Sequence, residues 1–340
     1  MSTAKKILLT TFAIALGCLW AVGGTFYYQA SQPASEDLKT RIFVIKPGQT
    51  LKQAARALSQ RGLIRSPNAF ILLAYLQKKQ NHIQAGEYEI SPAMLPAEIL
   101  QKISSGQTVK YSITVPEGYS VREIASLLEQ RGLADKNAFM DAAHDRQLIG
   151  SLGLPGDSLE GYLFPETYDI SRSTSEPAIV KSMLELFKSR VLTPENLERA
   201  GELHFDFHQV VTLASLIEKE TGLDAERKLI SSVFHNRLRK KMLLQTDPTV
   251  IYALRETFDG NIRKKDLSID SPYNTYKHIG LPPGPIASPG LKSVIAALYP
   301  AQTDYLYFVS RQDGSHQFSS NLIDHNRAVA EFQLKKSKKS

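Results

Sequence analysis

An uncharged, mostly apolar run from Ile7 to Tyr28 follows Lys5 and Lys6 near the start of the chain. A helix over residues 7–28 is long enough to cross the hydrocarbon core of a bilayer. Its positive flank, residues 1–6, is expected to stay in the cytoplasm, so the rest of the chain is expected outside. A cleaved signal peptide is the alternative, but the run is long for one and lacks a clear small-residue cleavage site. We therefore predict a single-pass anchor in the cell inner (cytoplasmic) membrane and a periplasmic remainder.

An internal repeat follows a polar linker over residues 29–41. The stretch FVIKPGQTLKQAARALSQRGLI, from residue 43, aligns with ITVPEGYSVREIASLLEQRGLA, from residue 113. Each copy predicts a short strand, a turn at glycine (Gly48 or Gly118) and an amphipathic helix that ends at a second glycine. The first copy continues into a predicted strand over Gly86–Ile90 and a predicted helix over Pro96–Ser104.

These strand-turn-helix units resemble the LysM wall-binding module, and we expect two of them over residues 42–110 and 111–150. A repeat of this kind can contact glycan, or it can simply orient the rest of the chain. Beyond it, we expect an α+β unit over residues 151–334. That unit includes a strand over residues 304–310 and a terminal helix over residues 326–334, with Val329 and Phe332 packed inward.

The segment VVTLASLIEKETG, residues 210–222, predicts a helix that carries an acidic residue beside apolar positions. At about 100° per residue, Val210, Leu213, Ala214 and Ile217 form one stripe, and Glu218 lies at its edge. A carboxyl in such a place is partly removed from water and can hold a proton near neutral pH, as a general acid requires. A solvated glutamate on an amphipathic helix gives the same pattern, so other segments must decide between the two.

Four loops combine proline and glycine with polar and aromatic residues: EGYLFPETY at 160–168, LQTDPTVIY at 244–252, SPYNTY at 271–276 and GLPPGPIASPG at 280–290. Proline and glycine fix backbone shape, while amides, carboxylates, hydroxyls and flat rings are suited to a carbohydrate groove. In order, and with Glu218 between the first two, these segments resemble the YceG-like family of endolytic murein transglycosylases. The resemblance extends from the anchor to about Phe332.

The resemblance implies a lyase that cuts peptidoglycan glycan strands internally, between N-acetylmuramic acid and N-acetylglucosamine, and leaves a 1,6-anhydromuramyl end. The catalytic glutamate of the family's ASLIEKE-type helix carries over to Glu218. One carboxyl suffices for this reaction because the muramyl C6 hydroxyl replaces the water that hydrolytic glycosidases activate. No metal and no organic cofactor are implied. Glycan-polymerising synthases are the implied partners, and control of chain length is the implied role.

Supporting roles in substrate binding are predicted for residues of two loops: Gln245, Asp247, Thr249, Tyr273 and Asn274. Each of them can equally serve as a satisfied turn residue or a buried structural residue. Glu160 and Glu166 remain candidates for a second acid. Glu220 lies about 200° around the helix from Glu218, so we interpret it as structural or supporting.

Composition narrows the remaining classes. The formal net charge is +7, partly from the basic tail at residues 335–340, but no nucleic-acid-binding motif is present. Cys18 is the only cysteine and lies in the apolar run, which excludes disulfide frameworks and thiol catalysis. His204 and His208 have the spacing of a metal-ligand pair, but there is no HExxH motif, so a metalloenzyme is a weak alternative. A membrane-tethered, non-catalytic wall-binding scaffold is the main alternative.

Overall fold

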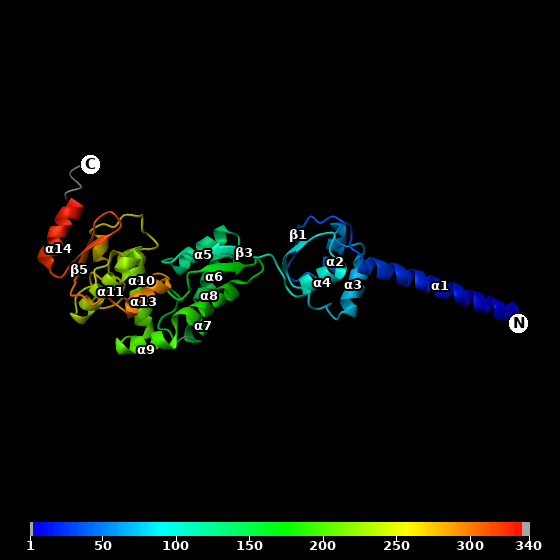
Figure 1. Ribbon diagram of the computed structural model, residues 1–340, viewed down its shortest axis with the longest axis horizontal. Helices are drawn as coiled ribbons and strands as arrows, with labels where there is room; N and C mark the ends of the chain where they lie inside the picture. The colour runs from blue at the N-terminus through cyan, green and yellow to red at the C-terminus, as the bar shows by residue number, and fades with distance from the viewer. Residues whose placement is uncertain (1–2, 152, 335–340) are drawn as a thin grey trace. The chain divides into compact units, whose positions relative to one another are not determined.

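A computed structural model describes residues 3–151 and 153–334, and it shows a mixed α+β chain with three two-stranded sheets (Figure 1). The chain forms two compact units. Unit 1 comprises the residues up to Tyr111 together with Asp169–Ser173, and unit 2 comprises Ser112–Tyr168 with the residues from Thr174 onward. The predicted α+β class is confirmed.

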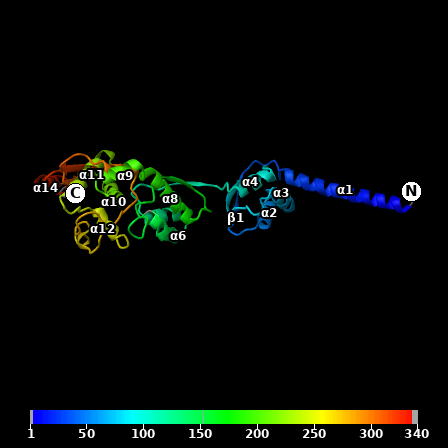
Figure 2. The ribbon, with the colours of Figure 1, turned by 90° about the horizontal axis from the view of Figure 1, so that it is seen from below.

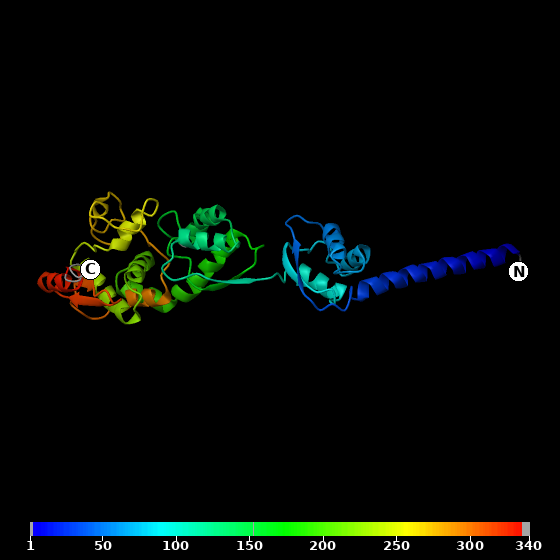
Figure 3. The ribbon, with the colours of Figure 1, turned by 90° about the horizontal axis from the view of Figure 1, so that it is seen from above.

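Helix α1 (Thr3–Ser31) begins unit 1 and appears in blue as one continuous helix (Figure 3). Its segment Thr10–Ser31 has 22 residues and a mean hydropathy of 1.4, and none of it is buried. A helix of this length and composition can cross a bilayer, and a signal sequence has the same properties. The structure therefore agrees with a membrane anchor or a signal sequence.

The folded part of unit 1 is a two-stranded sheet covered by helices. Strand β1 (Arg41–Ile45) pairs antiparallel with β2 (Gly86–Ile90), and Phe43 lies opposite Tyr88. These two rings pack with Leu58 and Phe70 in one core, and all four side chains are buried. The helices are α2 (Leu51–Gln60), α3 (Pro67–Leu76) and α4 (Pro96–Ser104). The predicted second strand and the predicted helix at Pro96 are confirmed.

The two repeats have the same local conformation. Gly48 and Gly118 both have φ of +75°, and the helix-ending Gly62 and Gly132 have φ of +68° and +63°. Glycine adopts this left-handed region without the steric cost that a side chain adds. The helices of both copies also begin with a capping box, so sequence similarity here reflects the same turn and cap chemistry.

The second repeat belongs to unit 2. It contains β3 (Tyr111–Thr114), α5 (Val121–Gln130), α6 (Lys136–Ala143) and the short helix α7 (Arg146–Ser151). Strand β3 pairs with β4 (Thr167–Ile170), and the division between the two units runs through these strands. Helix α6 packs against α8 (Glu176–Val191) of the following segment. The LysM-like character of the repeats stays a prediction.

Helix α10 (Phe207–Glu220) is the central element of unit 2. It begins after Asp206, whose side chain accepts a hydrogen bond from the backbone of Gln209 in a capping box. Residues 210–217 are all buried, because four other helices of unit 2 pack against α10, three of which are labelled near it in Figure 2. The single apolar stripe predicted from the sequence therefore underestimates how much of the surface of α10 is buried. The surrounding helices are α9 (Pro194–Glu202), α11 (Asp224–Arg239), α12 (Asp247–Ala253) and α13 (Leu291–Leu298).

A small sheet and a helix complete unit 2. The predicted strand is shorter than expected: β5 covers Tyr307–Ser310 and pairs antiparallel with β6 (His316–Ser319). The terminal helix starts earlier than predicted, as α14 (Leu322–Val329) after the Asn321 cap, and continues as a π-helical segment, Ala330–Leu334. Ala328 is its buried residue, and Val329 and Phe332 are half-buried. The predicted basic tail at 335–340 lies outside the described residues.

Candidate active site

Glu218 lies in the last turn of α10, where the helix ends at an extended Thr221. Only 6% of its side chain is exposed. One carboxylate oxygen, Oε2, accepts a hydrogen bond of 3.0 Å from the backbone N–H of Gly290. The other, Oε1, accepts one of 3.4 Å from Nη2 of Arg227. Both oxygens are thus held in place by donors from other elements.

Arg227 connects the acidic groups around Glu218. It projects from α11, and its side chain is also only 6% exposed. Its Nε donates to the Ser293 hydroxyl at 3.1 Å, and its Nη1 contacts the carboxylate of Asp224. Its Nη2 also lies 3.9 Å from the carboxylate of Glu117. One buried guanidinium therefore lies within reach of three carboxylates, which a planar group with several fixed donors allows.

Two loop segments enclose Glu218 from the side opposite its helix. The N–H of Gly118 donates to the carbonyl of Ser288, and the N–H of Ser288 donates to the carbonyl of Tyr119, both at 2.8 Å. Gly118 faces the catalytic candidate so closely that an added Cβ would lie 3.6 Å from Cγ of Glu218. The turn glycine of the second repeat thus forms part of the wall around this carboxylate.

A cavity of about 800 Å³ adjoins this cluster. Glu117, Arg227 and Lys292 contribute to its lining, together with apolar side chains of α13. Glu117 is 47% exposed. Burial raises the pKa of Glu117, the nearby charge of Glu218 raises it further, and Arg227 opposes the rise. The cluster therefore combines a nearly buried carboxylate, a fixed cation and a second carboxyl that faces solvent, which is suited to proton transfer at a cavity wall.

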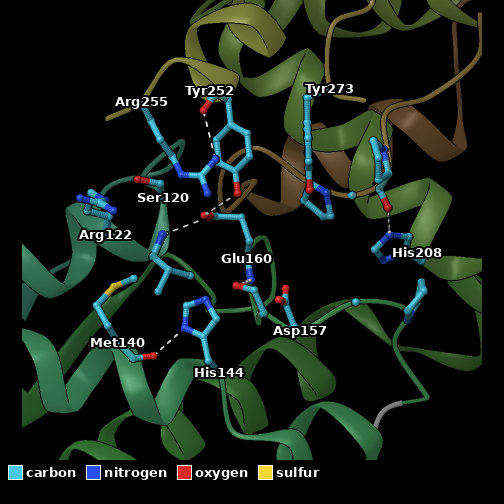
Figure 4. Close-up of a pocket in the computed structure, with 17 residues that line it drawn as sticks. Ser120, Arg122, Met140, His144, Asp157, Glu160, His208, Tyr252, Arg255 and Tyr273 are labelled. Atoms are coloured by element: carbon cyan, nitrogen blue, oxygen red, sulfur yellow. Dashed lines mark hydrogen bonds between the residues drawn. The ribbon is translucent and has the colours of Figure 1, made fainter. Parts of the chain in front are cut away.

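A separate cavity of about 560 Å³ contains Glu160 (Figure 4). Its carboxylate accepts a hydrogen bond of 3.0 Å from the N–H of Val121 and one of 3.3 Å from the hydroxyl of Tyr252. Burial raises the pKa of Glu160 to about 7, although both hydrogen bonds lower it. Glu160 can thus change its protonation state near neutral pH, but in a different cavity from the one beside Arg227.

Glu220 lines a third cavity, of about 510 Å³. Its carboxylate accepts a hydrogen bond from the Thr246 hydroxyl. Burial raises the pKa of Glu220 to about 6, and the bond from Thr246 opposes the rise. Glu220 thus lines this cavity itself, whereas Glu218 is linked to the cavity of about 800 Å³ only through its partner Arg227.

Comparison with known proteins decides the family. A model of the YceG-like family matches residues 43–331, which is most of the chain. The chain belongs to the YceG-like family. This YceG-like protein is 38% identical to the endolytic murein transglycosylase of Bacillus subtilis (strain 168), over 94% of this chain and 92% of that protein.

Two further relatives agree with this membership. The endolytic murein transglycosylase of Streptococcus pneumoniae serotype 2 (strain D39) is 30% identical, over 96% of this YceG-like protein and 65% of its own length. A crystal structure at 2.6 Å of a putative YceG-like protein from Listeria monocytogenes has a TM-score of 0.58 and 33% identity. The match covers 85% of this chain and 98% of the Listeria monocytogenes chain.

The five residues predicted to support Glu218 in this YceG-like protein lie in different surroundings. Gln245 and Asp247 line the cavity of Glu220, and Tyr273 lines the cavity of Glu160. Thr249 and Asn274 are fully buried. The Thr249 hydroxyl donates to a backbone carbonyl, and the Asn274 amide donates to two of them.

Sequence reasoning missed Arg227 and the Gly290 N–H as partners of Glu218. Arg227 follows nine positions later on another helix, and Gly290 follows 72 positions later, so no local spacing joins them to the carboxylate. The sequence signals near these two partners are the acidic first turn of α11 and the glycine that precedes α13. They indicate helix starts rather than contacts.

The histidine pair is not arranged to bind a metal. Nδ1 of His208 is 2.7 Å from the hydroxyl of Tyr162, and its Nε2 is 2.8 Å from the carbonyl of Pro283. Both ring nitrogens thus have protein partners. Across residues 3–151 and 153–334, no group of three or more histidine, cysteine, aspartate or glutamate side chains is placed to hold a metal ion.

Proposed function

We propose that this chain is an endolytic peptidoglycan lytic transglycosylase with Glu218 as its catalytic residue. It cleaves the β-1,4 bond between N-acetylmuramic acid and N-acetylglucosamine without water and leaves a 1,6-anhydromuramyl end. Membership of the YceG-like family and 38% identity to an endolytic murein transglycosylase over nearly the whole of both chains support this activity. The observation that carries the assignment is the fixed, nearly buried carboxylate of Glu218, whose partner Arg227 lines a cavity.

The reaction needs one group that first gives and then takes a proton. Protonated Glu218 donates its proton to the glycosidic oxygen, and the bond from that oxygen to muramyl C1 breaks. The C6 hydroxyl of the same sugar then forms a bond to C1, and its proton passes to the Glu218 carboxylate. The products are a free hydroxyl on one strand end and an internal ether on the other. No water is consumed, and Glu218 returns to its starting state.

The partners of Glu218 suit the second half of this cycle. When Glu218 has lost its proton, the Arg227 guanidinium and the Gly290 N–H stabilise the negative charge. They also fix both oxygens, so that the carboxylate is held in one orientation between the two proton transfers. Arg227 is therefore a positioning residue in this proposal.

The other parts of the chain fit a role close to the membrane. In this proposal α1 is a retained anchor, and it holds the enzyme at the outer face of the cytoplasmic membrane, where nascent glycan strands are made. Cleavage there would terminate or trim new strands, and neighbouring synthases would be partners. The two repeats would contact glycan as LysM-like units. Gln245 and Asp247 would contact substrate in the cavity of Glu220, whereas Thr249 and Asn274 would hold the local structure in shape.

Replacement of Glu218 by glutamine tests the assignment, because it keeps the shape of the side chain and removes the acid. We expect Glu218→Gln to lower turnover on purified peptidoglycan by at least about 100-fold, the lower end of what a positioned proton donor contributes. Glu195→Gln is the matched control, since it makes the same change at an exposed position in the first turn of α9, and it should keep the wild-type activity.

Mass analysis of the products tests the reaction type. After borohydride reduction, an anhydro end is about 20 mass units lighter than a hydrolytic end, roughly one water plus two hydrogens. Products without this difference would show hydrolysis. Full turnover by Glu218→Gln would refute the catalytic assignment. Strand binding by the wild-type protein without any cleavage would favour the wall-binding scaffold.

A further inference from the structure

The cavity around Glu160 is not used in the reaction scheme above. Its volume of about 560 Å³ lies within the range of roughly 300 to 1,000 Å³ that is usual for ligand sites. Its lining comes from the second repeat, the loop before Tyr162, α10, α12 and two later loops, all within unit 2. Segments far apart in the sequence thus meet around one hollow.

Two tyrosines form one wall of this cavity. The rings of Tyr252 and Tyr273 have centroids 5.0 Å apart and are tilted by 49° to each other. The guanidinium of Arg255 lies over the Tyr252 ring, 4.5 Å from its centroid. Figure 4 shows both rings standing over Glu160, with Arg255 and Arg122 on one side and Asp157 on the other. Flat ring faces beside charged groups offer both contacts that a sugar makes: ring packing and hydrogen bonds from hydroxyls.

The same structural elements connect this cavity to Glu218. His208 lines the cavity, and Glu218 follows ten positions later on α10, which corresponds to roughly 15 Å along a helix. Residues 120–122 and 283–285 also line the cavity. The same two segments continue to Gly118 and Gly290 beside Glu218, and they are joined through Ser288. The two segments that line the cavity therefore also supply the backbone around Glu218.

We propose that the Glu160 cavity is a remote glycan subsite, which binds one hexosamine of the strand several sugars away from the bond that is cut. The pyranose ring packs against Tyr252 and Tyr273, and its hydroxyl groups bond to Glu160 and its polar neighbours. This inference rests on the proposed transglycosylase function. Its consequence is specificity for length: only a strand that extends from Glu218 to the cavity gains the additional binding.

The test uses the full-length protein and peptide-free glycan strands that contain defined numbers of disaccharide units. Tyr273→Ala removes one ring, and Tyr273→Phe keeps the ring but removes the hydroxyl. The matched control is Tyr299→Ala, because Tyr299 is half-buried like Tyr273 but lies outside this cavity. Thermal unfolding of each variant shows whether the fold is kept.

We expect Tyr273→Ala to lower kcat/KM on long strands by about 3- to 10-fold, as the loss of an aromatic contact implies. On the shortest strands that are still cleaved, kcat/KM should not change. Tyr273→Phe should recover most of the loss, and Tyr299→Ala should behave as the wild type. A structural role would lower kcat/KM equally at all lengths.

Two outcomes would overturn the subsite. One is an unchanged length dependence in a stably folded Tyr273→Ala variant, and the other is an equal loss on short and long strands. Neither outcome affects the proposed function, which is tested by Glu218→Gln at every strand length. If Tyr273→Ala is too unstable for kinetics, Arg255→Ala provides the same test from the exposed side of the cavity, and the same two outcomes would overturn the proposal.

Discussion

Replacing Glu160 by glutamine should make the protein more stable at alkaline pH. Burial raises the pKa of Glu160 from its ordinary value of 4.5 to about 7. Between these two values the folded protein holds a proton that the unfolded chain has released. Stability therefore falls as pH rises through this window, and it stays low above pH 7. Glutamine is neutral at every pH, so the variant is free of this loss.

The size of the effect follows from the rise in pKa. At about 1.4 kcal/mol per pH unit, a rise from 4.5 to about 7 costs the folded state at most about 3 kcal/mol above pH 7. Glutamine keeps one oxygen to accept from the Val121 N–H or the Tyr252 hydroxyl, but it forms weaker bonds than a carboxylate. We therefore expect a net gain of about 1 to 3 kcal/mol at pH 8 and little change at pH 4.

Urea unfolding of the full-length protein in detergent, followed by circular dichroism, measures this gain. The difference in unfolding free energy between Glu160→Gln and the wild type should increase by about 2 kcal/mol from pH 5 to pH 8. Glu129→Gln, on the exposed face of α5, is the control for loss of one negative charge. A difference that is constant over this pH range would refute the reasoning.

Two further substitutions test the packing around the site. Arg227→Met leaves the Glu218 carboxylate nearly buried without its cation, so it should lower the unfolding free energy by about 3 to 5 kcal/mol and reduce turnover. Arg227→Lys should recover part of the unfolding free energy and part of the turnover. Equal values for the two variants would contradict the role of charge. Gly161→Ala should cost at least about 2 kcal/mol in urea unfolding, because Gly161 has φ of +85° and an added Cβ would overlap Pro285. Gly201→Ala, with open space around it, should cost nothing.

Local features of the fold could be predicted from the sequence. The repeat located both left-handed glycine turns and both capped helices, because turn and cap chemistry depends on residues a few positions apart. The strand at Gly86–Ile90 and the helix at Pro96–Ser104 have the predicted bounds. The extent of burial of α10 was underestimated, since the helices that cover it come from distant parts of the chain.

The site itself was only partly predictable. The position of Glu218 at the end of an apolar helix followed from periodicity, but its partners did not, because Arg227 and Gly290 reach it through tertiary packing. Loop composition indicated polar and aromatic residues without showing which cavity each would face. Tyr273 and Asp247 come from segments of similar composition, and they line separate cavities. The sequence cannot distinguish a side chain that faces a cavity from one, such as Asn274, that holds its own loop.

The reciprocal backbone bonds between residues 118–119 and Ser288 restrict how this protein can be dissected. A fragment that starts at residue 151 would lose Gly118, and with it the peptide groups that pair with both sides of Ser288. The stretch that supplies the Gly290 N–H to Glu218 would then be free to move. The second repeat is therefore an integral part of unit 2, and swapping it between homologues would also exchange part of the immediate surroundings of Glu218.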